Sequence, residues 1–327
     1  MSRKQTPHAA EFEEKEYEIP LYMELVRSRG QLWTPGQVLE QHTGAEAAVR
    51  ACSAYWEHVR RRPKPGVVLQ GAVLGLPATH PPLAQGGATP SFRANLFIQA
   101  KRCTRYTRGP TALRNLKKGV KRPDPKKVIR GFSVYQRWYP GRPPSRHQQK
   151  ALERLHYRVQ KGDARADVCY AAPVFDDRKS LWDAAMRGQI LARSTFPRAI
   201  LLKDHDKWVY TDPGPDGWKC SDPEYVEESR LEARLESLWE GVPVHQRHED
   251  DPVPSLRALA QAVHGAFIAS ELEDEALSEP SVTVRGLDGT YQGLDRDPVG
   301  LMAWILSAVA IHGLLWLVVG AEERESN

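Results

Sequence analysis

Two polar residues at the end of an apolar stretch could do chemistry on a bound phosphate. Gln99 and Lys101 close a run that begins at Asn95 and is otherwise largely apolar, and residues two apart in a strand point to the same face. The amide of Gln99 can hold a metal ion or its water, and the ammonium of Lys101 can orient an attacking water or stabilise developing charge. Because Mg²⁺ prefers carboxylate oxygens, such a site needs acidic partners from elsewhere. Glu40 and Glu46 lie upstream, on either side of a glycine turn.

The formal net charge of +5 conceals two opposed blocks of charge. Residues 101–130 hold twelve Lys or Arg against one acid, whereas residues 221–280 hold fifteen Asp or Glu against four Arg. The basic block is suited to phosphates and the acidic block to solvent or a protein partner. A second interpretation is that a basic loop and an acidic surface helix offset each other in one domain. The side chains predicted to contact nucleic acid are Arg102, Arg105, Arg108, Arg114, Lys117, Lys118, Lys121, Arg122, Lys126 and Lys127.

Periodicity and turn residues predict mixed helices and strands around these side chains. Pro20 should break an early helix. Thr34 followed by Pro35 has the form of a cap and first residue of a helix that carries Glu40. The sequence predicts helices over residues 11–16, 21–29, 34–40, 145–160 and 223–239, and strands over residues 95–101, 131–138, 168–174 and 207–210.

The order of these features resembles the PD-(D/E)XK restriction-endonuclease-like nucleases, in the branch with Gln in a Q-x-K motif. In that fold a helix glutamate precedes an acidic residue on the next strand, followed by the strand with the motif, a further strand and a helix. The resemblance covers roughly residues 24–175 and implies an α/β fold with a mixed central sheet flanked by helices, extended at its C-terminus by an α+β region. The expected domains are a nuclease-like core at 1–175 with a basic insertion at 101–130, and an accessory region at 176–327 with an acidic helix at 223–240 and a hydrophobic helix and strand at 298–319.

The resemblance further implies a metal-dependent nuclease that hydrolyses phosphodiester bonds of DNA, with RNA as a second candidate substrate and defence against foreign DNA as the setting. It assigns Glu40, Glu46 and Gln99 to Mg²⁺ or Mn²⁺ and makes Lys101 the catalytic lysine. The family usually has Asp where this chain has Glu46, whose extra methylene moves the carboxylate by about an ångström. The alternative is a catalytically inactive nuclease-like subunit that binds nucleic acid or acts as a scaffold.

The C-terminal region contains 22 residues without formal charge, 299–320, which is long enough to span a bilayer. The same residues can form a buried helix over 298–312, capped by Asp297 and stopped at Gly313, followed by a strand over 314–319. We expect the helix and strand to belong to a folded core, and a membrane anchor is the alternative.

The composition excludes several classes of protein. Hydrophobic residues make up 41% of the chain and include nine Trp, which excludes disorder throughout. The four cysteines are widely separated, so no disulfide framework is expected. The first residues contain no apolar segment of a secretory signal, so the expected location is cytoplasmic.

Overall fold

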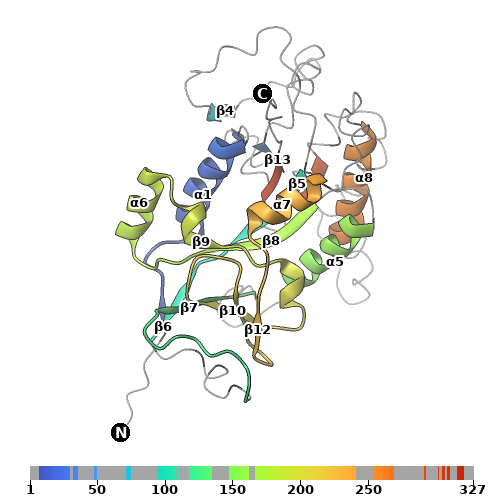
Figure 1. The fold of residues 1–327 in the computed structure, drawn as a ribbon. Helices are drawn as coiled ribbons and strands as arrows, with labels where there is room; N and C mark the ends of the chain where they lie inside the picture. Colours follow the sequence, from blue (N-terminus) through green and yellow to red (C-terminus); the bar gives the residue numbers. More distant parts are fainter. Residues whose placement is uncertain are drawn as a thin grey trace, which may run out of the picture. The chain divides into compact units, whose positions relative to one another are not determined.

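The computed structural model describes residues 7–29, 32–35, 48–49, 71–74, 94–107, 110, 113, 116, 118–134, 147–161, 166–240, 253–268, 291, 301, 304–305, 308–309 and 315–319. They form a mixed α/β protein with largely antiparallel sheets and flanking helices (Figure 1). The chain divides into two compact units, and the predicted boundary at residue 175 lies inside a segment of the first. The first unit comprises Met1–Leu25, Gln99–Glu153 and Val168–Arg234, and the second comprises Val26–Ile98, Arg154–Asp167 and Leu235–Asn327.

The first unit is built on a six-stranded sheet in which all neighbouring strands are antiparallel. A Cβ atom on Gly131 would lie 2.5 Å from the carbonyl oxygen of Trp208, so glycine is what allows the two central strands to approach here. The strand predicted at 207–210 is confirmed, and the one predicted at 131–138 is confirmed as far as residue 133. In spatial order the strands are β1 (His8–Ala9), β6 (Thr104–Tyr106), β7 (Ile129–Ser133), β10 (Lys207–Tyr210), β11 (Gly217–Lys219) and β12 (Glu224–Val226).

A second sheet has the strand order β13-β5-β8-β9, and its strands β5 and β8 each run from one unit into the other. Every residue of β8 is buried, as expected for the continuous apolar run predicted at 168–174. The bounds are β5 (Ala94–Ala100), β8 (Ala166–Pro173), β9 (Ser194–Thr195) and β13 (Leu315–Val319). The first unit also contains α6 (Arg178–Arg187) and two 3₁₀ turns, η1 (Leu191–Arg193) and η2 (Ala199–Leu202).

Helix α1 (Glu14–Arg29) is continuous through Pro20, so the predicted break is wrong. Tyr17 and Leu21 lie one turn apart on this helix and both are fully buried. Burying a large side chain contributes about 1.5–3 kcal/mol. Two such side chains offset the cost of about 3 kcal/mol that a proline imposes inside a helix.

The helix start predicted at Thr34 is also wrong, because pairing with a distant strand outweighs the local cap signal. Thr34 lies in β2 (Leu32–Pro35), opposite Ala72 of β4 (Gly71–Leu74), in a three-stranded sheet that also contains β3 (Ala48–Val49).

The acidic helix predicted at 223–239 begins later than expected, as α7 (Leu231–Glu240). The residues before it form β12, where Tyr225 lies opposite Trp218 in the register and their ring centroids are 5.1 Å apart. This cross-strand aromatic pair favours a strand over an extra helical turn.

In the second unit β13 pairs antiparallel with β5, and Trp316 lies opposite Phe97. The Trp316 side chain is buried, and its Nε1 donates a hydrogen bond of 3.0 Å to Oδ1 of Asn95. The predicted C-terminal strand is confirmed. The predicted helix before it is confirmed at its described positions, which are helical and buried with the period of one helix face: Leu301, Trp304, Ile305, Ala308 and Val309.

The remaining helices are α5 (His147–Lys161), α8 (Val253–Val263) and a π-helical turn at His264–Ile268. Helix α5 confirms the helix predicted at 145–160. The π-helical turn is closely packed, because a Cβ atom on Gly265 would lie 2.3 Å from the guanidinium carbon of Arg158. Within the described residues, no helix combines the length and apolarity that a bilayer crossing requires.

Candidate functional site

Gln99 lies near the end of β5 and Lys101 directly follows this strand, which is buried from Leu96 to Ala100. Their side chains are 3% and 4% exposed, and the residues between and before them, including Phe97 and Ile98, are also buried. The backbone N–H of Lys101 donates to the carbonyl oxygen of Ala171 at 2.8 Å, so β5 stays attached to β8 up to this residue. A solvent-exposed strand is therefore excluded for the Q-x-K motif.

The ammonium group of Lys101 lies near an aromatic ring, and two carboxylates of α1 influence its pKa. Its Nζ is 5.8 Å from the centre of the Tyr170 ring. Burial lowers the pKa of Lys101, and the negative charges of Glu14 and Glu18 on α1 act in the opposite direction. These two glutamates are four residues apart in the helix, so they lie on the same face. The buried lysine is thus within electrostatic range of two acidic side chains of α1.

Glu18 is itself a largely enclosed carboxylate. Burial raises its pKa, and the opposing influence of Lys15 comes from an ion pair of 3.1 Å between Nζ and Oε2. Its side chain is 12% exposed, against 61% for that of Lys15. The carboxylate therefore has one cation on its solvent side and a second, Lys101, toward the interior.

The side-chain oxygen of Gln99 has no hydrogen-bond partner among the described residues, although it is buried. Leaving a buried acceptor unsatisfied costs about 1–3 kcal/mol. An amide oxygen is a hard ligand of the kind that Mg²⁺ accepts, directly or through a bound water. Gln99 Oε1 therefore fits the metal role that the sequence predicts for it.

The other predicted metal ligands, Glu40 and Glu46, lie outside the described residues, as do Arg108, Arg114 and Lys117 of the predicted nucleic-acid contacts. Over the described ranges, no group of three or more His, Cys, Asp and Glu side chains is arranged to hold a metal ion.

Sequence reasoning missed the two carboxylates that face Lys101, Glu14 and Glu18. They belong to an acidic stretch that resembles an ordinary solvated helix. Only their spacing of four residues could have marked them as a pair.

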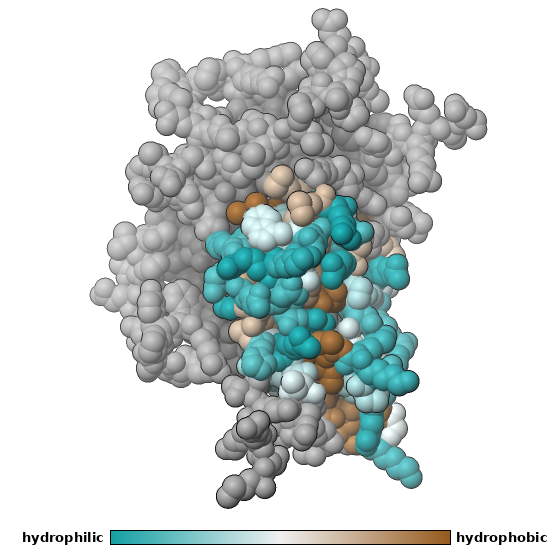
Figure 2. Space-filling model, turned by 90° about the vertical axis from the view of Figure 1, so that its left-hand side faces the viewer, coloured by the Kyte–Doolittle hydropathy of each residue, from teal (hydrophilic) through white to brown (hydrophobic). Residues whose placement is uncertain are grey.

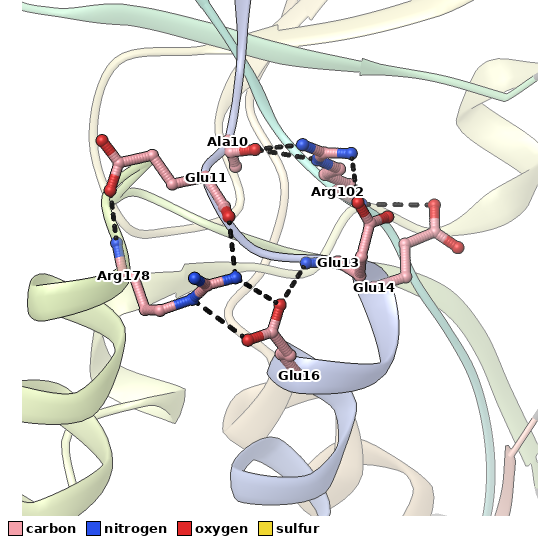
Figure 3. Close-up of polar contacts among 7 residues, drawn as sticks. All are labelled: Ala10, Glu11, Glu13, Glu14, Glu16, Arg102 and Arg178. Carbon is pink, nitrogen blue, oxygen red and sulfur yellow. Dashed lines mark hydrogen bonds and ion pairs between the residues drawn. The ribbon is translucent and has the colours of Figure 1, made fainter.

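The first turn of α1 is held on one side by Arg102 (Figure 3). Its Nε donates to the carbonyl oxygen of Ala10 at 3.0 Å, and its Nη1 forms an ion pair with Oε1 of Glu13 at 2.9 Å. The backbone N–H of Arg102 also donates to Oε1 of Glu14 at 3.3 Å. The residue that follows Lys101 thus binds the segment that carries the facing carboxylates.

Arg178 of α6 binds the same segment (Figure 3). Its Nη2 donates to the carbonyl oxygen of Glu11 at 3.1 Å and to Oε2 of Glu16 at 3.2 Å. Glu16 Oε2 also accepts a hydrogen bond of 2.8 Å from the backbone N–H of Glu13, which closes the first turn as in a capping box. The start of α1 is therefore fixed by side chains from two other segments of the chain.

Part of the basic block is engaged with acidic groups within the protein. Lys121 Nζ donates to the hydroxyl of Tyr225 at 2.7 Å and lies 3.7 Å from Glu227. Lys127 forms an ion pair of 2.6 Å with Asp212. These contacts support, for these two lysines, the interpretation that basic and acidic blocks offset each other.

Three other cations of the block lie on a segment that packs against the six-stranded sheet. Leu113 and Leu116 pack against Val209 and Trp218 of the six-stranded sheet, and Trp218 Nε1 donates to the carbonyl oxygen of Lys121 at 2.7 Å. The side chains of Lys118, Arg122 and Lys126 are exposed. Such a segment can present cations to a polyanion without folding anew.

The described surface is largely hydrophilic on the face that Figure 2 shows, with small hydrophobic areas between the polar side chains. On α6, two large apolar side chains are exposed, Trp182 at 55% and Met186 at 77%. They are four residues apart and share one helix face, but a pair of exposed apolar residues is normal for a protein surface, so they define no site.

We expect the joint replacement of Lys118, Arg122 and Lys126 by Ala to weaken DNA binding and flatten its salt dependence. Each lost phosphate contact should reduce the log–log slope of affinity against salt by roughly 0.9. Fluorescence anisotropy with a labelled duplex over a salt series measures this slope. As a matched control, Lys127→Ala should change the slope less, because Asp212 already neutralises Lys127. An unchanged slope in the triple variant would contradict a role in phosphate binding.

Comparison of the chain with models of known protein families, with curated proteins and with solved structures finds no match. A function must therefore be inferred from the chemistry of the described side chains. It consists of a buried lysine flanked by carboxylates and, two residues away on the same strand, a buried amide oxygen.

Proposed function

We propose that the chain is a metal-dependent nuclease that hydrolyses phosphodiester bonds of DNA, on a restriction-endonuclease-like core. The observation that carries the proposal is the burial of Gln99 and Lys101 together at the end of β5, with Gln99 Oε1 unpaired among the described residues. Burying an amide oxygen without a hydrogen-bond partner is costly, so a buried group of this kind points to a functional site.

The ligands proposed for a divalent ion are Gln99 Oε1 and the carboxylates of Glu40 and Glu46. When bound, Mg²⁺ or Mn²⁺ polarises a phosphoryl oxygen and lowers the pKa of its water. Lys101 is proposed to orient the attacking water and to stabilise the charge that develops on the phosphate.

The surroundings of Lys101 suit this role. Burial lowers its pKa, which brings a lysine closer to the range in which it can exchange a proton. The carboxylates of Glu14 and Glu18 oppose the shift and favour the charged ammonium form. The exposed cations Lys118, Arg122 and Lys126 are proposed to attract the DNA backbone without reading its sequence.

Incubation of the purified chain with supercoiled plasmid tests the proposal. We expect nicked or linear DNA with Mg²⁺ or Mn²⁺ and intact plasmid with EDTA, since the metal is required for the reaction. A Lys101 variant purified in the same way controls for contaminating nucleases. Binding of DNA without cleavage under any metal would favour the alternative of an inactive nucleic-acid-binding subunit, and the absence of both would contradict the two functions together.

A further inference from the structure

We propose that Arg102 is a positioning residue, which together with Arg178 clamps the first turn of α1 so that Glu14 and Glu18 stay beside Lys101. The catalytic importance of the clamp rests on the proposed function. The clamp itself is a property of the fold and can be tested without any cleavage assay.

The contacts of Arg102 are those of a clamp and not of a phosphate-binding arginine. An arginine that recognises phosphate offers two parallel N–H groups of its fork to the anion. In Arg102 the Nε and Nη2 groups both donate to the carbonyl oxygen of Ala10, and Nη1 pairs with Glu13. The fork is occupied by the segment that leads into α1, and the side chain is 31% exposed.

The second arginine approaches the same short segment from another element. Arg178 lies in the first turn of α6, and its guanidinium contacts Glu11 and Glu16, on either side of Glu13. Its own backbone N–H donates to Oε2 of Glu11 at 3.1 Å. Two arginines from different parts of the chain therefore fix residues 10–16 at several points.

The clamp can affect the surroundings of Lys101 because Arg102 directly follows Lys101 in the chain. The side chain of Arg102 binds the carbonyl oxygen of Ala10, just before the helix starts. The backbone N–H of Arg102 donates to the carboxylate of Glu14, so one residue fixes both groups. Glu18 follows one helical turn later and moves with Glu14. A displacement of about 1 Å in a reacting group costs on the order of 100-fold in rate.

Arg102→Lys and Arg102→Ala separate a clamp from a phosphate contact. Lysine keeps the positive charge but lacks the planar fork that reaches Ala10 and Glu13 together. We expect both variants to lower kcat by on the order of 10- to 100-fold, with an unchanged salt slope of DNA binding. If Arg102 instead contacts phosphate, Lys preserves activity and Ala reduces the slope by roughly 0.9, which would overturn the proposal.

A second measurement reports on the clamp independently of cleavage. Lys101 in the native protein is treated with a lysine-acetylating reagent, and its modification is followed by mass spectrometry. Arg102→Lys and Arg178→Lys should each increase the labelling of Lys101 several-fold, because a loosened α1 exposes the amine. Lys179→Ala, next to Arg178 but paired on the surface with Asp183, is the control and should leave it unchanged.

The two measurements distinguish the possible failures. Unchanged labelling of Lys101 in all Arg102 and Arg178 variants overturns the clamp, whatever the chain does to DNA. Increased labelling in a chain that cuts no DNA supports the clamp and contradicts the proposed function. Thermal unfolding of each variant shows whether the labelled proteins are folded. Because Arg102 and Arg178 are replaced in separate variants, misfolding of one variant still leaves the other as a test.

Discussion

Lys101→Met is expected to remove metal-dependent cleavage of DNA while leaving DNA binding intact. Methionine is an unbranched side chain that fills the same buried space but carries neither a charge nor a proton donor. Loss of one preorganised donor to the charge of a transition state costs on the order of 10²- to 10³-fold in rate. Single-turnover cleavage of a labelled duplex, with the protein in excess, measures this loss without a contribution from product release.

Some loss of stability is expected in this variant, because removing one charge of a buried group leaves the carboxylates of Glu14 and Glu18 without the Lys101 cation. Urea unfolding of Lys101→Met therefore shows whether lost activity reflects lost structure. Lys179→Met, which replaces an exposed lysine on α6, is the control and should retain activity. Cleavage by Lys101→Met at the original rate would remove Lys101 from the chemistry.

Trp316→Ala is expected to destabilise the protein by about 3–5 kcal/mol, the usual cost of truncating a large buried aromatic side chain. Trp316 is 2% exposed, lies opposite Phe97 in the β13–β5 pair and donates to Asn95. Urea unfolding with linear extrapolation gives the free-energy difference. Trp182→Ala, at a tryptophan that is 55% exposed, should change stability by no more than about 0.5 kcal/mol.

A chain truncated after Asp297 extends the same test. Removal of β13 leaves one edge of β5 without its hydrogen-bonded neighbour, so the truncated chain should aggregate. A membrane anchor would give the opposite pattern, with a folded truncated chain in solution and the full chain in the membrane pellet.

The strands at the centre of the fold could be predicted from the sequence because their signals are local. Continuous apolar runs give β5 and β8, and the short apolar run of β10 follows a turn. The C-terminal strand could be predicted for the same reason. Strands β5, β8 and β10 are buried along most of their length, so side-chain type alone identifies them.

Two of the failures arise because burial or a distant partner overrides a local signal. Pro20 is tolerated because Tyr17 and Leu21 are buried, and Thr34 enters a strand because β4 pairs with it. The carboxylates of Glu14 and Glu18 could not be connected to Lys101 from spacing, since folding brings together segments far apart in the chain. Periodicity placed Gln99 and Lys101 on one strand face but did not predict that both are buried.

The pairing of β5 with β13 also has a consequence for the order of events during synthesis. The hydrogen bond between Trp316 and Asn95 closes a separation of 221 residues. At a synthesis rate of about 5–20 residues per second, a ribosome needs roughly 10 to 40 s to cover that distance. For that time the strand that carries Gln99 and Lys101 exists without one of its two neighbours. A nascent chain therefore carries Gln99 and Lys101 on an unfinished sheet, and the proposed DNA cleavage is expected only after β13 has left the ribosome.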